Sequence, residues 1–322
     1  YMPTLPDLSR EVQRQLAAEN RGNVPGVGTP IAKDFEAWLN YLVSTPPWLS
    51  DPDRLRNRAA FFDVAAAIHQ ALTEAQLRTT NDPRREWLQK LVMHWQENSA
   101  SVITLNYDIL VELAWLTEYQ QSRHVAQDLY SVAITPIETR TGAVKGYTPE
   151  PEGQGMRLLK LHGSLTWWYS GDGSPPGDPV YDQGAQGPWE YFSRQDHHRQ
   201  YVIDKAPMIV PPTAVKSEYY GNQIIRSLWV QAAEALRDAD EIVIMGCSLP
   251  PSDLLFRSML ATEVKAGAAI VPVNLREDVA NELEQLFEVI LAGEAARVTI
   301  NRNYVGKEKA VEQWVIDVVN PE

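Results

Sequence analysis

The sequence predicts an α/β protein with a Rossmann-like, doubly wound, mainly parallel sheet, an N-terminal helical block and a long loop insertion. Residues 8–98 show the periodicity of helices and none of strands, whereas residues 99–320 alternate short apolar runs with helical segments. Residues 170–200 are rich in glycine, proline, aspartate and aromatic side chains, which is typical of a long excursion from a sheet. Strands interleaved with helices indicate a parallel sheet covered on both faces.

The helical block, residues 8–98, is predicted to contain amphipathic helices broken by turns. Residues 31–43 place their apolar side chains on one helical face, at Ile31, Phe35, Trp38, Leu39 and Leu42. Residues 54–77 and 82–98 follow a similar spacing and are predicted to form two more helices.

The rest of the chain is predicted to form the core. Strands are expected at residues 102–105, 132–135, 158–161, 208–210, 241–245, 269–274 and 297–300. Helices are expected at residues 109–121, 217–238, 252–265, 277–291 and 307–319. We therefore predict a single domain over residues 1–322, with a Rossmann-like core of residues 99–169 and 201–320 and an insertion of residues 170–200.

Composition argues against several classes of protein. The net charge is −13, from 29 basic and 42 acidic residues, so direct binding to nucleic acid is not expected. Backbone amides can still hold a phosphorylated small molecule. Cys247 is the single cysteine, which excludes a disulfide framework and fits a reducing cytoplasm. No apolar run reaches the roughly 18–20 residues of a membrane span, so no membrane partner is expected.

Polar or glycine-containing motifs follow four of the predicted strands. They are residues 104–108 (Thr-Leu-Asn-Tyr-Asp), residues 162–164 (His-Gly-Ser), residues 246–248 (Gly-Cys-Ser) and Asn274. The carboxyl ends of parallel strands meet at one edge of a sheet, so these motifs are expected to converge on one crevice.

Each motif also has a purely structural interpretation. Asn106 or Asp108 can cap the helix that follows. A lone histidine at a strand end, such as His162, is more often an ordinary hydrogen-bonded residue than a catalyst. Gly246 and Ser248 can form a tight turn between a strand and a helix. The shared position of the motifs at strand ends favours the ligand-binding interpretation.

Taken together, residues 104–108, 161–164 and 246–250 resemble the motifs of sirtuin-like (silent information regulator type) NAD-consuming domains. They are most similar to the prokaryotic branch that hydrolyses NAD in anti-phage defence. The resemblance covers most of residues 100–320 and implies a Rossmann-like domain that binds NAD+ as its substrate.

The resemblance implies roles for four residues on the nicotinamide side. Asn106 would hold the nicotinamide ribose and place a water at its C1′ atom. His162 would lie near the ribose hydroxyls, as a general base or as an orienting group. Asp108 would lie near the nicotinamide carboxamide, and Thr104 belongs to the same substrate-binding motif.

On the adenosine side, the resemblance implies a second group of contacts. Gly246, Cys247 and Ser248 match the loop that holds the phosphate and the adenosine-side ribose. Asn274 matches an asparagine that contacts the adenosine ribose.

The chemistry of NAD cleavage suits these residue types. The leaving group is already a cationic pyridinium and departs neutral, so little acid catalysis is needed. The transition state resembles an oxocarbenium ion and needs orientation, a nearby dipole and a placed water. An amide and an imidazole therefore suffice where ordinary glycosidases use two carboxylates. A histidine of ordinary pKa, about 6.5, can be neutral at cytoplasmic pH.

The sequence departs from the family in two places. Sirtuin deacylases carry a four-cysteine zinc ribbon between the second and third motifs, where this sequence has no cysteine, so neither zinc nor protein deacylation is expected. The glycine-rich loop Gly-Ala-Gly-x-Ser is also missing, because the glycines of residues 22–30 follow no strand. Residues 1–12 look like the segment that follows this loop, so we expect either that native residues with the loop precede Tyr1 or that the protein binds NAD poorly.

Two lesser candidates have structural interpretations that we favour. Asp196, His197 and His198 could bind a metal, but a solvated turn is the preferred interpretation and no metal site is predicted. Trp167 and Trp168 could stack on a base, but we favour core packing or a flap over the site.

The sequence thus favours a cytoplasmic NAD+ glycohydrolase that releases nicotinamide and ADP-ribose and depletes NAD in defence. By the resemblance, it is expected to work as a homo-oligomer or with a regulatory or sensor protein partner. One alternative is an NAD-dependent protein ADP-ribosyltransferase or deacylase, which needs a cleft for a second substrate. The other is a catalytically silent sensor of NAD or ADP-ribose.

Overall fold

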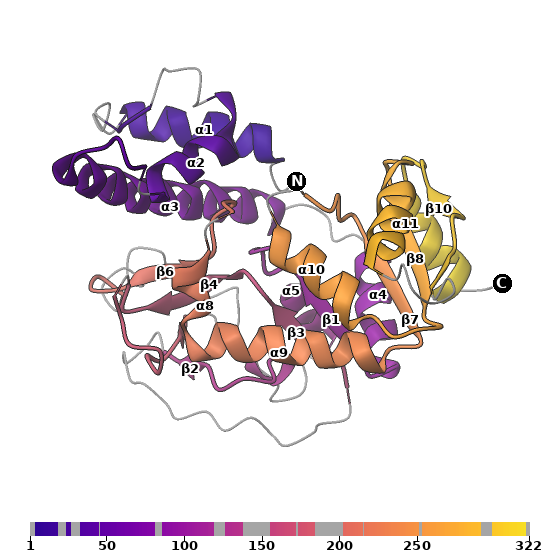
Figure 1. Ribbon diagram of the computed structural model, residues 1–322. Helices are drawn as coiled ribbons and strands as arrows, with labels where there is room; N and C mark the ends of the chain where they lie inside the picture. Colours follow the sequence, from indigo (N-terminus) through magenta and orange to yellow (C-terminus); the bar gives the residue numbers. More distant parts are fainter. Residues whose placement is uncertain are drawn as a thin grey trace.

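The computed structural model describes residues 4–18, 24–26, 33–44, 46–80, 86–118, 126–137, 155–171, 173–183, 202–214, 216–250, 253–290 and 298–319. They form a mixed α/β protein with parallel strand pairs (Figure 1). Much of the predicted insertion, including Asp196, His197 and His198, lies outside the described residues. No helix in the described ranges combines the length and the apolar character needed to cross a membrane.

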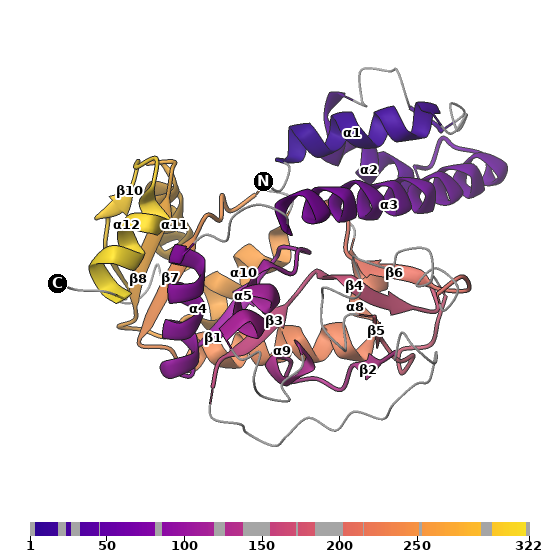
Figure 2. The same cartoon turned by 180° about the vertical axis from the view of Figure 1, so that it is seen from behind.

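The N-terminal region is helical, as predicted. Its helices are α1 (Leu5–Ala18), α2 (Phe35–Val43), α3 (Asp51–Thr80) and α4 (Glu86–Glu97). In both views α1 and α2 lie beside the long α3, whereas α4 packs against α5 (Leu110–Glu118) (Figures 1 and 2). The predicted block of residues 8–98 is therefore divided, because α4 covers the strands and α1 to α3 form a separate layer.

Local sequence explains why these helices form. Leu8, Val12 and Leu16 recur at every fourth position of α1 and are all buried, which is the spacing of one helical face. Asp34 precedes α2, and its carboxylate accepts a hydrogen bond from the Ala37 amide at 3.0 Å. This contact satisfies one of the amides that a helix start leaves without a partner.

Every predicted strand overlaps an observed one, and strands alternate with helices from β6 to β9, whereas β2 to β6 follow one another with no described helix between them. The strands are β1 (Ser101–Thr104), β2 (Thr135–Pro136), β3 (Arg157–Lys160), β4 (Gly163–Tyr169), β5 (Tyr181–Asp182), β6 (Ala206–Ile209), β7 (Glu241–Met245), β8 (Ala269–Asn274), β9 (Thr299–Ile300) and β10 (Tyr304–Val305). The remaining α-helices are α8 (Ser217–Tyr220), α9 (Gln223–Asp238), α10 (Leu254–Glu263), α11 (Val279–Ile290) and α12 (Ala310–Trp314).

The described strands pair into three sheets, whereas the sequence predicts one. β1 pairs with β3, and β7 pairs with β8, which also pairs with β9 and β10; all of these pairs are parallel. The third sheet has the order β2-β5-β4-β6, and its strand β4 runs antiparallel to both β5 and β6. Both views place the β1–β3 pair between the other two sheets (Figures 1 and 2).

Strand β4 accounts for much of this difference, because the sequence analysis treats His162-Gly163-Ser164 as the end of a strand. Gly163 adopts a φ of +81°, a left-handed conformation at the point where the chain leaves β3 and enters β4. A Cβ atom at Gly163 would collide with the Met208 carbonyl, so only glycine fits here. Residues 163–169 then form an almost entirely buried strand of the third sheet instead of a loop.

Trp167 and Trp168 pack in the core, in agreement with the favoured interpretation. Trp167 is fully buried, and its ring meets Tyr130 edge-on with centroids 5.1 Å apart. Trp168 meets the buried His69 of α3 in the same way at 5.0 Å. These contacts join the helical layer to the third sheet.

A buried ion pair joins β3 to α5. Lys160 and Glu112 lie 2.8 Å apart, and each side chain is only 1% exposed. The Tyr130 hydroxyl donates to Glu112 at 2.9 Å, and the Lys160 ammonium also donates to the Asp108 carbonyl. Such charges are tolerated only when paired and hydrogen-bonded. The pair therefore holds the segment between β1 and α5 against β3.

Lys160→Met is expected to lower the free energy of unfolding by about 3–5 kcal/mol, because it leaves the Glu112 carboxylate buried without a counter-ion. Urea unfolding followed by circular dichroism measures the loss. The double variant Lys160→Met/Glu112→Leu removes both charges and should recover a large part of it. A double variant less stable than Lys160→Met would contradict the assignment.

Candidate functional site

In the motif after β1, Asp108 caps the next helix, whereas the side-chain amide of Asn106 is exposed. The Thr104 hydroxyl accepts a hydrogen bond from the backbone N–H of Asn106 at 3.1 Å, and the Asp108 carboxylate accepts one from the backbone N–H of Leu110 at 3.1 Å. Asp108 therefore caps α5. Burial raises the pKa of Asp108, and nearby Lys160 opposes the rise. The Asn106 side chain is exposed and forms no hydrogen bond to a described residue.

His162 follows β3 and is only 4% exposed. Tyr107 stacks on its ring with centroids 6.4 Å apart, and Trp229 of α9 lies at 6.5 Å. The Val210 amide donates to the His162 carbonyl at 2.9 Å, and the Tyr107 hydroxyl donates to the Val210 carbonyl at 2.5 Å. Segments from β1, β3, β6 and α9 thus enclose one imidazole.

The polar edge of this imidazole faces an ion pair. Its Nε2 atom lies 3.4 Å from the Lys216 ammonium and 3.6 Å from an Asp253 carboxylate oxygen. Lys216 and Asp253 are in direct contact, with side chains 5% and 12% exposed. The ring also makes a hydrogen bond to the backbone of Leu105.

These surroundings control the charge of the site. Burial and the Lys216 cation lower the pKa of His162 to about 3, so the ring is uncharged at neutral pH. Burial lowers the pKa of Lys216 to about 8, opposed by Glu36 of α2. Contact with the Asp253 carboxylate favours the ammonium form of Lys216.

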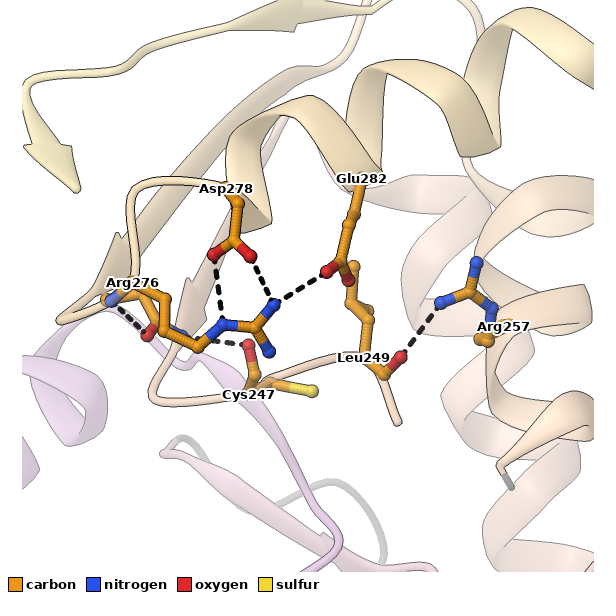
Figure 3. A network of polar contacts seen from close by, with 7 residues as sticks. Cys247, Leu249, Arg257, Arg276, Asp278 and Glu282 are labelled. Carbon is orange, nitrogen blue, oxygen red and sulfur yellow. Dashed lines mark hydrogen bonds and ion pairs between the residues drawn. The ribbon is translucent and has the colours of Figure 1, made fainter. Parts of the chain in front are cut away.

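The third motif forms a strained turn beside open space. Gly246 and Leu249 both have left-handed φ values, +63° and +48°. Leu249 is buried, and its carbonyl accepts a hydrogen bond from Arg257 at 2.8 Å, as Figure 3 shows. Gly246 and Ser248 are exposed. A Cβ atom at Gly246 would meet no heavy atom within 4 Å, so the backbone there is open to an approaching molecule.

Asn274 supports this turn from the end of β8. Its amide group donates to the Cys247 carbonyl at 2.9 Å, and its side-chain oxygen accepts from the Arg276 amide at 3.0 Å. Because Asn274 is only 6% exposed, it fixes the turn rather than projecting from it. Burial raises the pKa of the Cys247 thiol, which keeps it protonated at neutral pH.

A charged network flanks the turn. The Arg276 guanidinium contacts Asp278 at 2.6 and 2.9 Å and Glu282 at 2.7 Å (Figure 3). Its positive charge is therefore balanced by two carboxylates. Asp278 helps to raise the pKa of Arg276, and the pKa of Asp278 is lowered in return.

The structure brings the predicted motifs together in two linked groups. Leu105, Tyr107 and His162 are in direct contact, and Asp253, which follows the third motif, reaches His162. Residues 246–249 and Asn274 form the second group. In the chain, Asp253 of the first group follows Leu249 of the second by four residues.

Sequence reasoning missed Lys216 and Asp253. Lys216 follows a proline-containing loop after β6, and Asp253 immediately precedes α10. Both positions resemble ordinary turn or cap positions, and Asp253 makes no capping hydrogen bond to α10. The sequence did offer one signal for both residues, because each is a charged residue that follows a strand and a pair of prolines. No group of three or more His, Cys, Asp or Glu side chains in the described ranges could hold a metal ion.

Comparison with known proteins assigns no family to this arrangement. No family model matches the chain, and no curated protein matches it. The resemblance to sirtuin-like domains stays a prediction, so the function has to be argued from the chemistry of the residues themselves.

The buried His162 should make stability depend on acid. Its folded-state pKa, about 3, lies below the ordinary value of 6.5, so between these limits the unfolded chain binds a proton that the folded chain does not. The contribution of the uncharged His162 to the free energy of unfolding is complete above pH 6.5 and is lost as the pH falls toward 3. His162→Gln removes this dependence. The stability of the natural protein relative to His162→Gln should therefore fall by on the order of 3 kcal/mol between pH 7 and pH 4.

Urea titrations of both proteins at several pH values measure this difference. A difference that stays constant from pH 7 to pH 4 would show that His162 is protonated equally in the folded and unfolded states.

Proposed function

We propose that the chain is an NAD+ glycohydrolase that cleaves the bond between nicotinamide and ribose. The observation that carries this proposal is the contact of Tyr107, from the first motif, with His162, from the second, next to the exposed Asn106 and to Asp253, which follows the third motif in the chain. The parallel pairs β1–β3 and β7–β8, with α9 packed against β1 and β3 and α11 against β8, support a Rossmann-like arrangement in which a nucleotide lies across the strand ends.

The proposed reaction needs no general acid. The bond between C1′ and the pyridinium nitrogen breaks, its electron pair neutralises the nitrogen, and nicotinamide leaves. A water oxygen then bonds to C1′ and releases a proton, giving ADP-ribose. Asn106 is free to bind the ribose and to place this water. The nearby carboxylates are already engaged, Asp108 as a helix cap and Asp253 with Lys216.

Of the two roles implied for His162, the geometry favours orientation over general base catalysis. An imidazole of pKa about 3 is a weak base, and water bound to an oxocarbenium-like carbon loses its proton without a strong one. His162 would act by fixing Leu105 and Tyr107, and thereby the position of Asn106 between them.

The turn formed by residues 246–249 is proposed to receive the adenosine side. Exposed backbone at Gly246 and Ser248 next to open space allows close approach of a phosphate. Asn274 would act by holding Cys247 in place. We further propose that the enzyme works in the cytoplasm, depletes NAD in defence and depends on self-association or on a regulatory or sensor protein.

A catalytically silent sensor of NAD or ADP-ribose is the second candidate. It is favoured by the enclosure of His162, whose polar edge faces Lys216 and Asp253 instead of an open space. Such a protein would bind the nucleotide at the same strand ends without turning it over.

Asn106→Ala and His162→Ala are each expected to lower kcat for NAD cleavage by at least roughly 10²-fold, because one removes the ribose contact and the other its support. The measurement is nicotinamide and ADP-ribose released by the purified full chain. Asn98→Ala, an exposed asparagine just after α4, is the matched control and should retain full activity.

Unchanged turnover in both site variants, with the fold intact by circular dichroism, would refute the site assignment. Nucleotide binding without turnover in the natural protein would favour the sensor.

Gly246→Ala is expected to raise KM for NAD by about tenfold, because its methyl group enters the space proposed for the nucleotide. Gly267→Ala is a matched control, since Gly267 also has a left-handed φ, of +88°, and open space at its Cβ position. Both variants should lose a similar stability, about 1–2 kcal/mol. An equal rise in KM for the two would indicate a general effect of backbone strain.

A further inference from the structure

Two charged residues beside His162, the buried Lys216 and the largely buried Asp253, have no part in the roles implied by the sequence motifs. Lys216 lies directly before α8, and Asp253 lies directly before α10, so they come from loops far apart in the chain. Their side chains are 5% and 12% exposed. Burying an ion pair carries a desolvation cost that its Coulomb attraction often fails to offset, so its presence at this position calls for an explanation.

The contacts of His162 define its tautomer. The hydrogen bond to the Leu105 backbone favours the protonated ring, so the ring donates and the carbonyl accepts. Nε2 faces Lys216 and Asp253, which assigns this donor to Nδ1. Nε2 then keeps a lone pair directed at the Lys216 ammonium, 3.4 Å away.

We propose that Lys216 and Asp253 are positioning residues that hold His162 as an uncharged, oriented imidazole. The Lys216 ammonium faces the Nε2 lone pair, and the Asp253 carboxylate fixes that ammonium and balances its charge. This inference goes one step beyond the proposed function and rests on it for its link to NAD cleavage. An imidazolium at this position would repel the positive charge that develops on the ribose.

The remaining groups around the ring are consistent with this assignment. Tyr107 stacks on it, and burial raises the pKa of this phenol, which therefore stays neutral. Tyr220 of α8 is neutral for the same reason. Trp229 carries no charge, and Glu36 acts on Lys216 by favouring its ammonium form. Burial therefore favours the uncharged ring, and Lys216 and Asp253 are the charged groups that face it among the described residues.

The test is nitrogen-15 NMR of the full chain labelled at histidine, with His162→Gln to assign the signal. At pH 7 the natural protein should show an uncharged His162 with its proton on Nδ1, and the ring should stay uncharged at pH 5. In Lys216→Met the Asp253 carboxylate has no partner but the ring, so the pKa of His162 should rise by about two pH units or more.

Two further variants separate positioning from mere structural support. Lys216→Arg keeps the cation and Asp253→Asn removes only the anion, so His162 should stay uncharged at pH 5 in both. Lys265→Met, which breaks a pair with Asp240, is the matched control and should leave the spectrum of His162 unchanged. A ring protonated on Nε2 in the natural protein, or one that stays uncharged at pH 5 in Lys216→Met, would overturn the proposal.

Turnover distinguishes this inference from the proposed function. If the chain cleaves NAD, kcat/KM should fall at a higher pH on the acid side of its pH profile in Lys216→Met. The shift of this pH should equal the rise in the pKa of His162. If the natural protein and its variants give the expected spectra but none of them cleaves NAD, the glycohydrolase proposal is refuted and the positioning role of Lys216 and Asp253 stands. If Lys216→Met cleaves NAD normally and the spectrum of His162 is unchanged, the positioning role is refuted and the glycohydrolase proposal stands.

Discussion

The left-handed conformation of Gly163, between β3 and β4, is the constraint on which the core and the candidate site both depend. The left-handed φ of this glycine and its close approach to the Met208 carbonyl place β4 antiparallel to β6. This pairing brings Val210 against the backbone of His162, and the chain beyond β6 then delivers Lys216 to the imidazole. A side chain at position 163 would therefore disturb the packing of β4 and the surroundings of His162 together.

Two largely buried ion pairs involve lysines on either side of Gly163 in the chain. Lys160 and Glu112 lie before it and hold the segment that contains Asn106 and Asp108. Lys216 reaches back from beyond it and meets Asp253. Lys160 is the last residue of β3 and meets Glu112 within α5, whereas Lys216 lies beyond β6 and meets Asp253 just before α10. Since such pairs seldom add net stability, their value lies in fixing loops relative to one another, which hydrophobic contacts of similar size would do less specifically.

Periodicity and turn chemistry were sufficient to predict most elements, including the bounds of β7 and β8, because these patterns are local. They were not sufficient to predict strand pairing: nothing local in residues 163–169 shows that β4 pairs antiparallel to β6. The same limit applies to the site. Asp108 and Asn106 are equally plausible helix caps in sequence, and only the contact with Leu110 distinguishes them. Lys216 and Asp253 acquire their significance from a partner in another loop.

The charge balance around His162 bears on the chemistry that this site can support. NAD+ carries a positive charge on nicotinamide before cleavage, and that charge passes to the ribose in the transition state. Lys216 alone would oppose this, but its charge is balanced by Asp253 and the imidazole is uncharged. The motif carboxylates are engaged, so the residues do not provide the pair of free acids used by ordinary glycosidases. An exposed amide beside a neutral ring instead suits a glycosidic bond whose leaving group departs without accepting a proton.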